Sequence, residues 1–142
     1  MAIVTREMVR KKLVARIEEQ RPLWTRFPVL IEYDNAIAVN QSTQSNPYLC
    51  VTIVYQDGYQ TTLSKNPGDR VLGTIVIEAK AKEGSGTAQA NDLLEHFYRK
   101  VHMTDTLTPL RTLAARFASS PARNGWVAQG ALIPFWFDSI PE

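Results

Sequence analysis

The stretch VLGTIVIEAKAK, residues 71–82, decides the fold class of this chain. In its second half the apolar residues Ile77, Ala79 and Ala81 alternate with glutamate and lysine. An alternation with period two predicts a β-strand that has one buried face and one wet face. Such a strand needs neighbouring strands and a covering layer, so the segments on either side of it should supply both.

Two helices are predicted to supply that covering layer. The first covers residues 5–20, with Thr5 as its N-cap and an apolar stripe through Val9, Leu13 and Ile17. Its basic residues come early and its glutamates late, which is opposite to what the helix dipole favours, so we expect packing or a partner to hold this helix. The second covers residues 88–103 and has the cleanest helical stripe, whose members are Ala90, Leu93, Leu94, Phe97, Tyr98 and Val101.

The remaining segments are β-prone. They cover residues 28–33, 48–55, 59–63, 111–118 and 126–137. Asp57-Gly58 is a hairpin-type dipeptide, and the pattern of residues 111–118 fits a helix as well as a strand, with a following turn that favours the strand. Pro134 cannot donate a ladder hydrogen bond, which suggests a sheet edge or a bulge. The order of helix, three strands, helix and two strands predicts a single α+β domain over residues 1–142, with two helices on one face of a mainly antiparallel sheet of about five strands.

Composition excludes several classes of protein. The chain has 142 residues, 44% of them hydrophobic and 21% charged, which is typical of a globular domain. Its net charge of +2 gives little support to a dedicated nucleic-acid binder. The single cysteine, Cys50, rules out an internal disulfide framework. No apolar run approaches the length of a membrane span, so we expect a soluble, cytoplasmic protein without membrane contact.

The candidates for catalysis are weak. His96 and His102 lie six residues apart on one helix and point to different faces, so they cannot share a metal ion. Cys50 lies in an apolar run and is expected to be a small buried hydrophobe. The run GSGT at residues 84–87 lacks the pattern of a phosphate-binding loop and is interpreted as a strand-to-helix turn. We therefore expect no catalytic residue, metal or cofactor.

Two features predict an interface instead. The polar segment from Asp34 to Asn46 is long for a connection, and we expect a neighbour to order it. Several large aromatic residues lie near the end of the last strand. Either at least one of them faces outward, as at an interface, or a second layer or a long loop covers it. The interface candidates are Asn40, Gln41, Ser42, Thr43, Gln44, Ser45, Tyr59, Phe135, Trp136 and Phe137.

The order of short motifs resembles one protein family. The motifs are PYLCV at residues 47–51, QTTL at 60–63, RVLG at 70–73, GSGT at 84–87 and IPFWFD at 133–138. In this sequence of appearance they resemble the tail terminator proteins of long-tailed bacteriophages and prophages, including the lambda-type tail-end proteins. The resemblance covers almost the whole chain.

The resemblance implies a virion structural protein that is not an enzyme. Proteins of that family form a hexameric ring that caps the tail tube, ends its polymerisation and provides the interface for head–tail joining. The implied partners are further copies of the chain, the tail tube protein and a head–tail connector or neck protein, with DNA at most passing through the ring. The implied location is the head-proximal end of the virion tail, after assembly in the bacterial cytoplasm. The alternatives are another neck or head–tail connector protein, or a small hydrolase that uses a carboxylate or His96.

Overall fold

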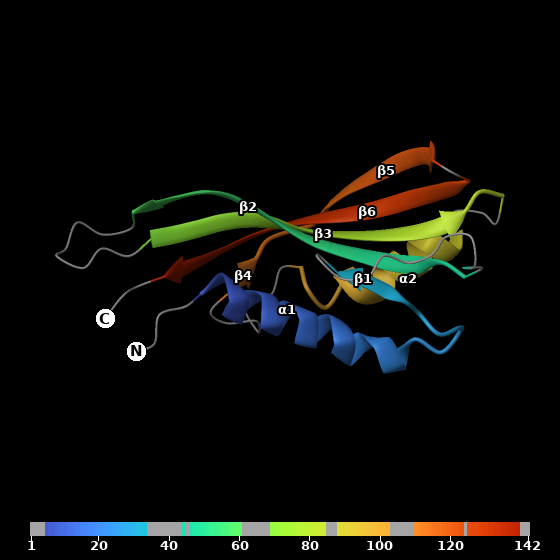
Figure 1. Cartoon of the computed structure of the whole chain (residues 1–142), viewed down its shortest axis with the longest axis horizontal. Helices are drawn as coiled ribbons and strands as arrows, with labels where there is room; N and C mark the ends of the chain where they lie inside the picture. Colours follow the sequence, from blue (N-terminus) through green and yellow to red (C-terminus); the bar gives the residue numbers. More distant parts are fainter. Residues whose placement is uncertain are drawn as a thin grey trace.

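The structure is a computed structural model that describes residues 5–33, 44, 46–60, 69–84, 88–102, 110–123 and 125–139. Its elements are α1 (Arg6–Gln20), η1 (Arg21–Leu23), β1 (Ile31–Tyr33), β2 (Tyr48–Gln60), β3 (Asp69–Lys82), α2 (Ala88–Tyr98), β4 (Arg111–Thr112), β5 (Arg116–Arg123) and β6 (Trp126–Ser139). The strands form one sheet in the order β1-β2-β3-β6-β4, and β5 also pairs with β6 (Figure 1). The predicted α+β fold is confirmed.

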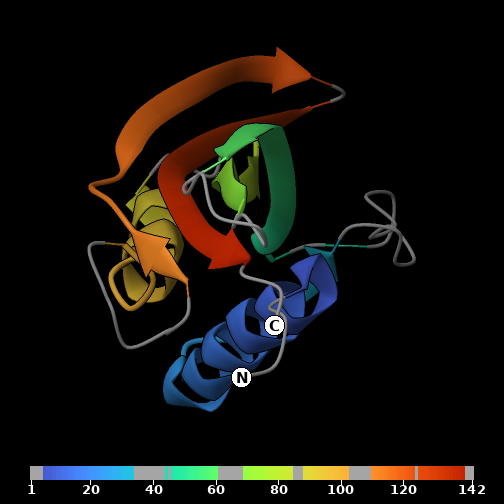
Figure 2. The same cartoon turned by 90° about the vertical axis from the view of Figure 1, so that its left-hand side faces the viewer.

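Both helices pack on the same face of the sheet. Val9, Leu13 and Ile17 of α1 and Leu93 and Phe97 of α2 join one buried cluster. The strands contribute alternate residues to this cluster, which include Leu49, Val51, Ile75, Ile77, Ile133, Phe135 and Phe137. Figure 2 shows α1 on the side of the molecule opposite to β5, which arches away from it. The opposite face of the sheet is covered by neither helix.

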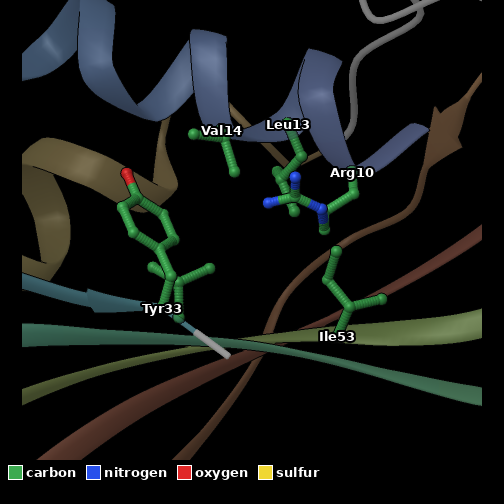
Figure 3. A pocket seen from close by; sticks show the side chains of 6 residues that line it. Arg10, Leu13, Val14, Tyr33 and Ile53 are labelled. Carbon is green, nitrogen blue, oxygen red and sulfur yellow. The ribbon is translucent and has the colours of Figure 1, made fainter. Parts of the chain in front are cut away.

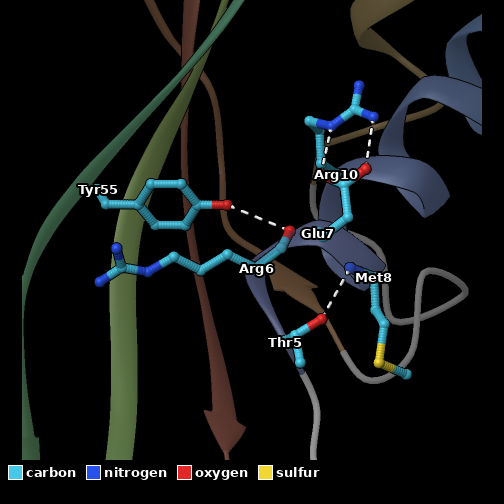
Figure 4. A network of polar contacts seen from close by, with 6 residues as sticks. All are labelled: Thr5, Arg6, Glu7, Met8, Arg10 and Tyr55. Atoms are coloured by element: carbon cyan, nitrogen blue, oxygen red, sulfur yellow. Dashed lines mark hydrogen bonds and ion pairs between the residues drawn. The ribbon is translucent and has the colours of Figure 1, made fainter.

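The start of α1 is anchored to the sheet. The hydroxyl of Thr5 accepts a hydrogen bond from the amide of Met8 at 3.2 Å, which confirms the predicted N-cap (Figure 4). The Tyr55 hydroxyl of β2 donates to the carbonyl of Arg6 at 3.5 Å, and the Arg6 guanidinium lies over the Tyr55 ring at 4.8 Å. The helix is therefore held by packing and by contacts at its first turn, although its charge order opposes its dipole.

The second helix is shorter than the sequence predicts. It ends at Tyr98 instead of Met103, because the amides of Val101 and His102 both bond to the Tyr98 carbonyl and tighten the chain into a turn. Val101 nevertheless reaches the core, where it is 0% exposed. The predicted apolar stripe is confirmed by burial of all its members.

The sheet has six strands, and it is mainly antiparallel as predicted, with β1 running parallel to β2. Two strand predictions are corrected by the structure. Asp57 and Gly58 do not form a hairpin: β2 continues through them, and its register against β3 shifts between Gln56 and Tyr59, which marks a β-bulge. The predicted strand 111–118 is divided into β4 and β5, and β5 extends to Arg123, beyond the predicted end of the strand.

The division between β4 and β5 lies opposite Pro134. Strand β6 is an inner strand of the sheet. The carbonyl of Pro134 accepts a hydrogen bond from the Leu113 amide at 2.9 Å, and the nitrogen of a strand residue points to the same side as its carbonyl, so the Pro134 nitrogen faces the segment between β4 and β5. That nitrogen has no hydrogen to offer, and regular pairing with β6 stops after Thr112 and resumes at Arg116. The prediction of an edge or bulge at Pro134 is therefore wrong: β6 is an inner strand with an unbroken register against β3, and the missing donor is accommodated by an interruption in the partner strand.

Candidate interaction surface

Cys50 is placed where it cannot serve readily as a nucleophile. It lies on β2 and is 9% exposed, packed with Tyr48 and Trp126. Burial raises the pKa of its thiol to about 12, and Glu32 and Glu78 add to the rise while Lys80 opposes it. The thiol is therefore protonated at neutral pH and behaves as an apolar side chain.

The two histidines have separate surroundings. The Nε2 atom of His96 lies 2.8 Å from the carbonyl of Gln20, to which it can donate, so His96 joins α2 to the end of α1. The His102 ring lies edge-on to the Tyr98 ring, with 4.8 Å between ring centroids. Within the described part of the chain, no three His, Cys, Asp or Glu side chains are grouped to hold a metal ion.

Two hollows in the surface were considered as ligand sites. Beneath α1, a cavity of about 20 Å³ is lined by Arg10, Leu13, Val14, Tyr33, Val51 and Ile53 (Figure 3). It has room for about one water molecule. A wider hollow of about 280 Å³ lies beside α2, where Arg26 pairs with Asp92 at 2.8 Å and Arg99 with Glu95 at 2.6 Å. Its charges are already paired, which leaves them little to offer an ionic ligand.

The uncovered face of the sheet has the features of an interaction surface. Because side chains alternate along a strand, the residues between the core residues point to this face. Apart from Thr74, which lies between Val54 and Pro134, the middle of this face is apolar. We name as the open-face patch Val54, Leu72, Val76, Leu113, Leu132, Pro134 and Trp136. Val54 is 50% exposed and Leu113 51%, and the other five are partly exposed. A contiguous exposed apolar patch of this kind is typical of a binding surface.

Charged groups are fixed at one end of this patch. Arg70 and Asp138 form a two-pronged ion pair with N–O distances of 2.8 and 3.0 Å. The Arg70 guanidinium lies 4.0 Å from the centre of the Trp136 ring, and that of Arg111 lies 5.5 Å from it. An apolar centre with tryptophan and arginine at its border resembles the composition of protein–protein interfaces.

Only some of the interface residues predicted from the sequence lie at the open-face patch. Phe135 and Phe137 are each 1% exposed and belong to the core, so the surface does not include them. Trp136, between them, points to the uncovered face and is partly exposed. Tyr59 pairs with Arg70 through the backbone. Gln44 donates to the Asn46 carbonyl at 2.9 Å. The other loop candidates, residues 40–43 and 45, lie outside the described residues.

Sequence reasoning missed most of the open-face patch. The sequence did carry a sign of this patch in residues 71–76, where apolar residues occur at positions that point to both faces of the strand rather than to one face. Leu113 could not be assigned to a face of the sheet because its segment had no clear period.

Among the described residues, no helix is long and apolar enough to cross a membrane.

Comparisons with known proteins establish the fold but not the function. The chain matches 27 solved protein chains in structure. One of them, whose name is a bare sequence identifier, has a TM-score of 0.69 and 10% sequence identity, and the match covers 98% of this chain and 99% of that chain. At this identity the likeness shows the fold alone. No family model matches the sequence, and no curated protein matches it significantly.

Proposed function

We propose that the chain is a tail terminator of a long-tailed phage or prophage, a structural protein without catalytic activity. In this proposal, six copies form a ring on the head-proximal end of the tail. The ring stops growth of the tail tube and gives the head–tail connector a surface to join. Its partners are further copies of itself and the tail tube protein.

The observation that carries the proposal is the open-face patch. Its exposed apolar centre and its border of Trp136, Arg70 and Arg111 are features of a surface that binds protein. An assembly protein needs such a surface, because repeated contacts between identical chains must exclude water from an apolar centre. The motif order described above adds the reason to choose a tail terminator among assembly proteins.

The protonated state of Cys50 and the backbone contact of His96 make the hydrolase alternative less attractive. A nucleophilic cysteine needs a lowered pKa and an adjacent base, whereas burial raises the pKa of Cys50. His96 has its Nε2 atom engaged with the Gln20 carbonyl.

The test is assembly on tail tubes. Native mass spectrometry of the purified chain should show monomers and six-membered rings, and electron microscopy should show a ring at one end of tail tubes assembled with the chain. Tube length should be limited when the chain is added during polymerisation. A chain that stays monomeric and leaves tube ends bare and tube growth unchanged would overturn the proposal. Binding to connector rings without binding to tubes would favour the neck-protein alternative.

A further inference from the structure

Strand β5 forms a free edge of the sheet. It pairs with β6 alone, and Figure 1 shows it as the outermost strand on its side of the molecule. The side chains of residues 116–120 are all exposed, so both faces of this stretch lie in solvent. In an antiparallel pair, alternate residues turn their amide and carbonyl groups away from the neighbouring strand. Within the described part of the chain, no second strand bonds to the outward groups of this stretch.

This stretch of β5 lacks the features that keep sheet edges apart. Edges are commonly protected by lysine, by proline, by a bulge or by a charge that points inward. Residues 116–120 contain neither lysine nor proline, and their one charged residue, Arg116, stands at the end. Pro121, which has no amide hydrogen, follows, and the register against β6 shifts after Ser120. The stretch open to a further strand is therefore five residues long, with Ala118 at its centre.

An exposed aromatic side chain lies on the same stretch. Phe117 is 59% exposed, and its ring lies edge-on to the ring of Tyr98 in α2, with 5.1 Å between ring centroids. Phe117 pairs with Ala131, a member of the core cluster, so it points to the helix side of the sheet. Its ring is packed on one side and lies in water on the other. A further strand with an apolar side chain at this level would cover it.

We propose that β5 of a second copy of this chain pairs antiparallel with β5 across a twofold axis at Ala118, which joins the two sheets into one. In this register Arg116 lies opposite Ser120 of the second copy, so no like charges face each other. Phe117 lies opposite Ser119 of the second copy and diagonal to the second Phe117, at a distance of roughly 7–8 Å that aromatic side chains can bridge. The two exposed rings therefore cover each other, which favours a second copy over a strand of unrelated sequence.

The pairing of β5 with β5 goes beyond the proposed function and does not rest on it. A twofold contact uses the same patch on both copies and ends at a dimer, whereas a ring needs two different patches. Five paired residues extend over roughly 17 Å, and an edge of this length covers far less than the roughly 800 Å² that each partner buries in a standard interface. The dimer should therefore be weak, forming in concentrated solution and dissociating on dilution for native mass spectrometry.

The test is disulfide formation at the twofold axis. Opposite residues of an antiparallel pair have α-carbons roughly 4.5–5.5 Å apart, which is within the range of a disulfide. In concentrated solution under mild oxidation, Ala118→Cys should therefore give a covalent dimer. Ala118 is exposed, so folding should survive the change. Cys50 is buried and is present in every variant.

Two equally exposed positions on the same face of β5 provide matched controls. Arg116→Cys alone and Ser120→Cys alone should stay monomeric, because the two copies of each thiol lie roughly 14 Å apart along the strands. An equal mixture of these two variants should crosslink, since position 116 of one copy lies opposite position 120 of the other. Crosslinking of Arg116→Cys alone as fast as that of Ala118→Cys would overturn the proposed register.

Charge changes at Ser120 give an independent measurement. Ser120→Glu places a carboxylate opposite Arg116 of the second copy, and Ser120→Arg places a like charge there; each contact occurs twice by symmetry. In sedimentation equilibrium, the dimer dissociation constant should fall roughly 2- to 10-fold for Ser120→Glu and rise by a similar factor for Ser120→Arg. Both effects should shrink at high salt. Equal shifts in the same direction for the two variants would contradict the pairing.

The outcomes separate this inference from the proposed function. A wild type that sediments as a monomer at every concentration, together with an Ala118→Cys variant that gives no covalent dimer, overturns the β5 pairing and leaves the proposed ring untouched. Specific crosslinking at Ala118, in a chain that forms no ring alone or on tail tubes, supports the pairing while the proposed function fails.

Discussion

At the scale of single residues, Gly73 shows how closely the core is packed. A Cβ atom built at this position would lie 2.5 and 2.6 Å from two ring carbons of Phe135 and 2.7 Å from the Val54 carbonyl oxygen. The Phe135 ring is 1% exposed and lies edge-on to Tyr55 with centroids 5.9 Å apart, so it has little freedom to move. The absence of a side chain at Gly73 therefore makes room for Phe135.

Gly73→Ala should destabilise the protein by about 1–3 kcal/mol, because the methyl group overpacks the core. Denaturant unfolding measures this directly. Gly130→Ala is the matched control on the neighbouring strand, since its Cβ would meet nothing nearer than 3.4 Å, and it should cost about 1 kcal/mol or less. Equal losses from the two variants would show that the close approach of Phe135 to Gly73 does not determine the effect.

Cys50 gives a prediction about pH. Burial raises the pKa of its thiol from the ordinary value of about 9 to about 12 in the folded chain. At pH 7.5 native Cys50 should react with a thiol reagent far more slowly than free cysteine, since only the thiolate reacts and the folded thiol keeps its proton. The unfolded chain should react at the ordinary rate, which is the control.

The raised pKa of Cys50 also makes the stability of the fold depend on pH. Above pH 9 the unfolded thiol ionises while the folded one keeps its proton, so this group lowers stability as pH rises from 9 toward 12. Fast labelling of the folded chain at neutral pH would show that Cys50 is accessible and that its burial has been assigned wrongly.

At the scale of elements, α2 depends on a few fully buried side chains. Phe97 is 0% exposed and packs edge-on against His96, with the two ring centroids 5.0 Å apart. Phe97→Ala should cost about 3–5 kcal/mol of unfolding free energy through lost burial and the cavity left behind. Leu23→Ala, at a position 65% exposed, is the control and should stay within about 0.5 kcal/mol. A loss below about 1 kcal/mol for Phe97→Ala would contradict the assigned face of α2.

Elements with a clear period were predictable, and those shaped by distant contacts were not. Both helices and β3 follow from their apolar spacing, and the Thr5 cap follows from its side chain. The division of β4 from β5 depends on Pro134 in another strand, which no local pattern contains. Likewise, Phe137 was included among the interface candidates because aromatic crowding was visible, whereas its burial depends on where the helices lie.

At the scale of the whole molecule, the open face should matter for assembly and not for folding. Val54→Arg adds a charge at a site that is 50% exposed, so the melting temperature should change by only a few degrees. The ring fraction should fall strongly because an unpaired charge would be placed in an apolar contact. Native mass spectrometry and thermal unfolding give the two readouts.

Met8→Arg is the matched control for this change. Met8 is 44% exposed on α1, which packs on the sheet face opposite the open-face patch, so its substitution should leave contacts through the patch intact. Equal ring loss in both variants would mean that added positive charge, wherever it lies, prevents assembly. Unchanged assembly in Val54→Arg would remove the open face from the contact.

The interruption opposite Pro134 has a consequence for local opening. From Arg116 to Ser120, strand β5 is paired to β6 alone, and its side chains are exposed over this length. Because pairing stops between Thr112 and Arg116, opening of β5 need not spread into β4 or the inner strands. Amide protons in β5 should therefore exchange with deuterium through a low-energy local fluctuation, while those of β3 and β6 exchange only when the whole domain unfolds.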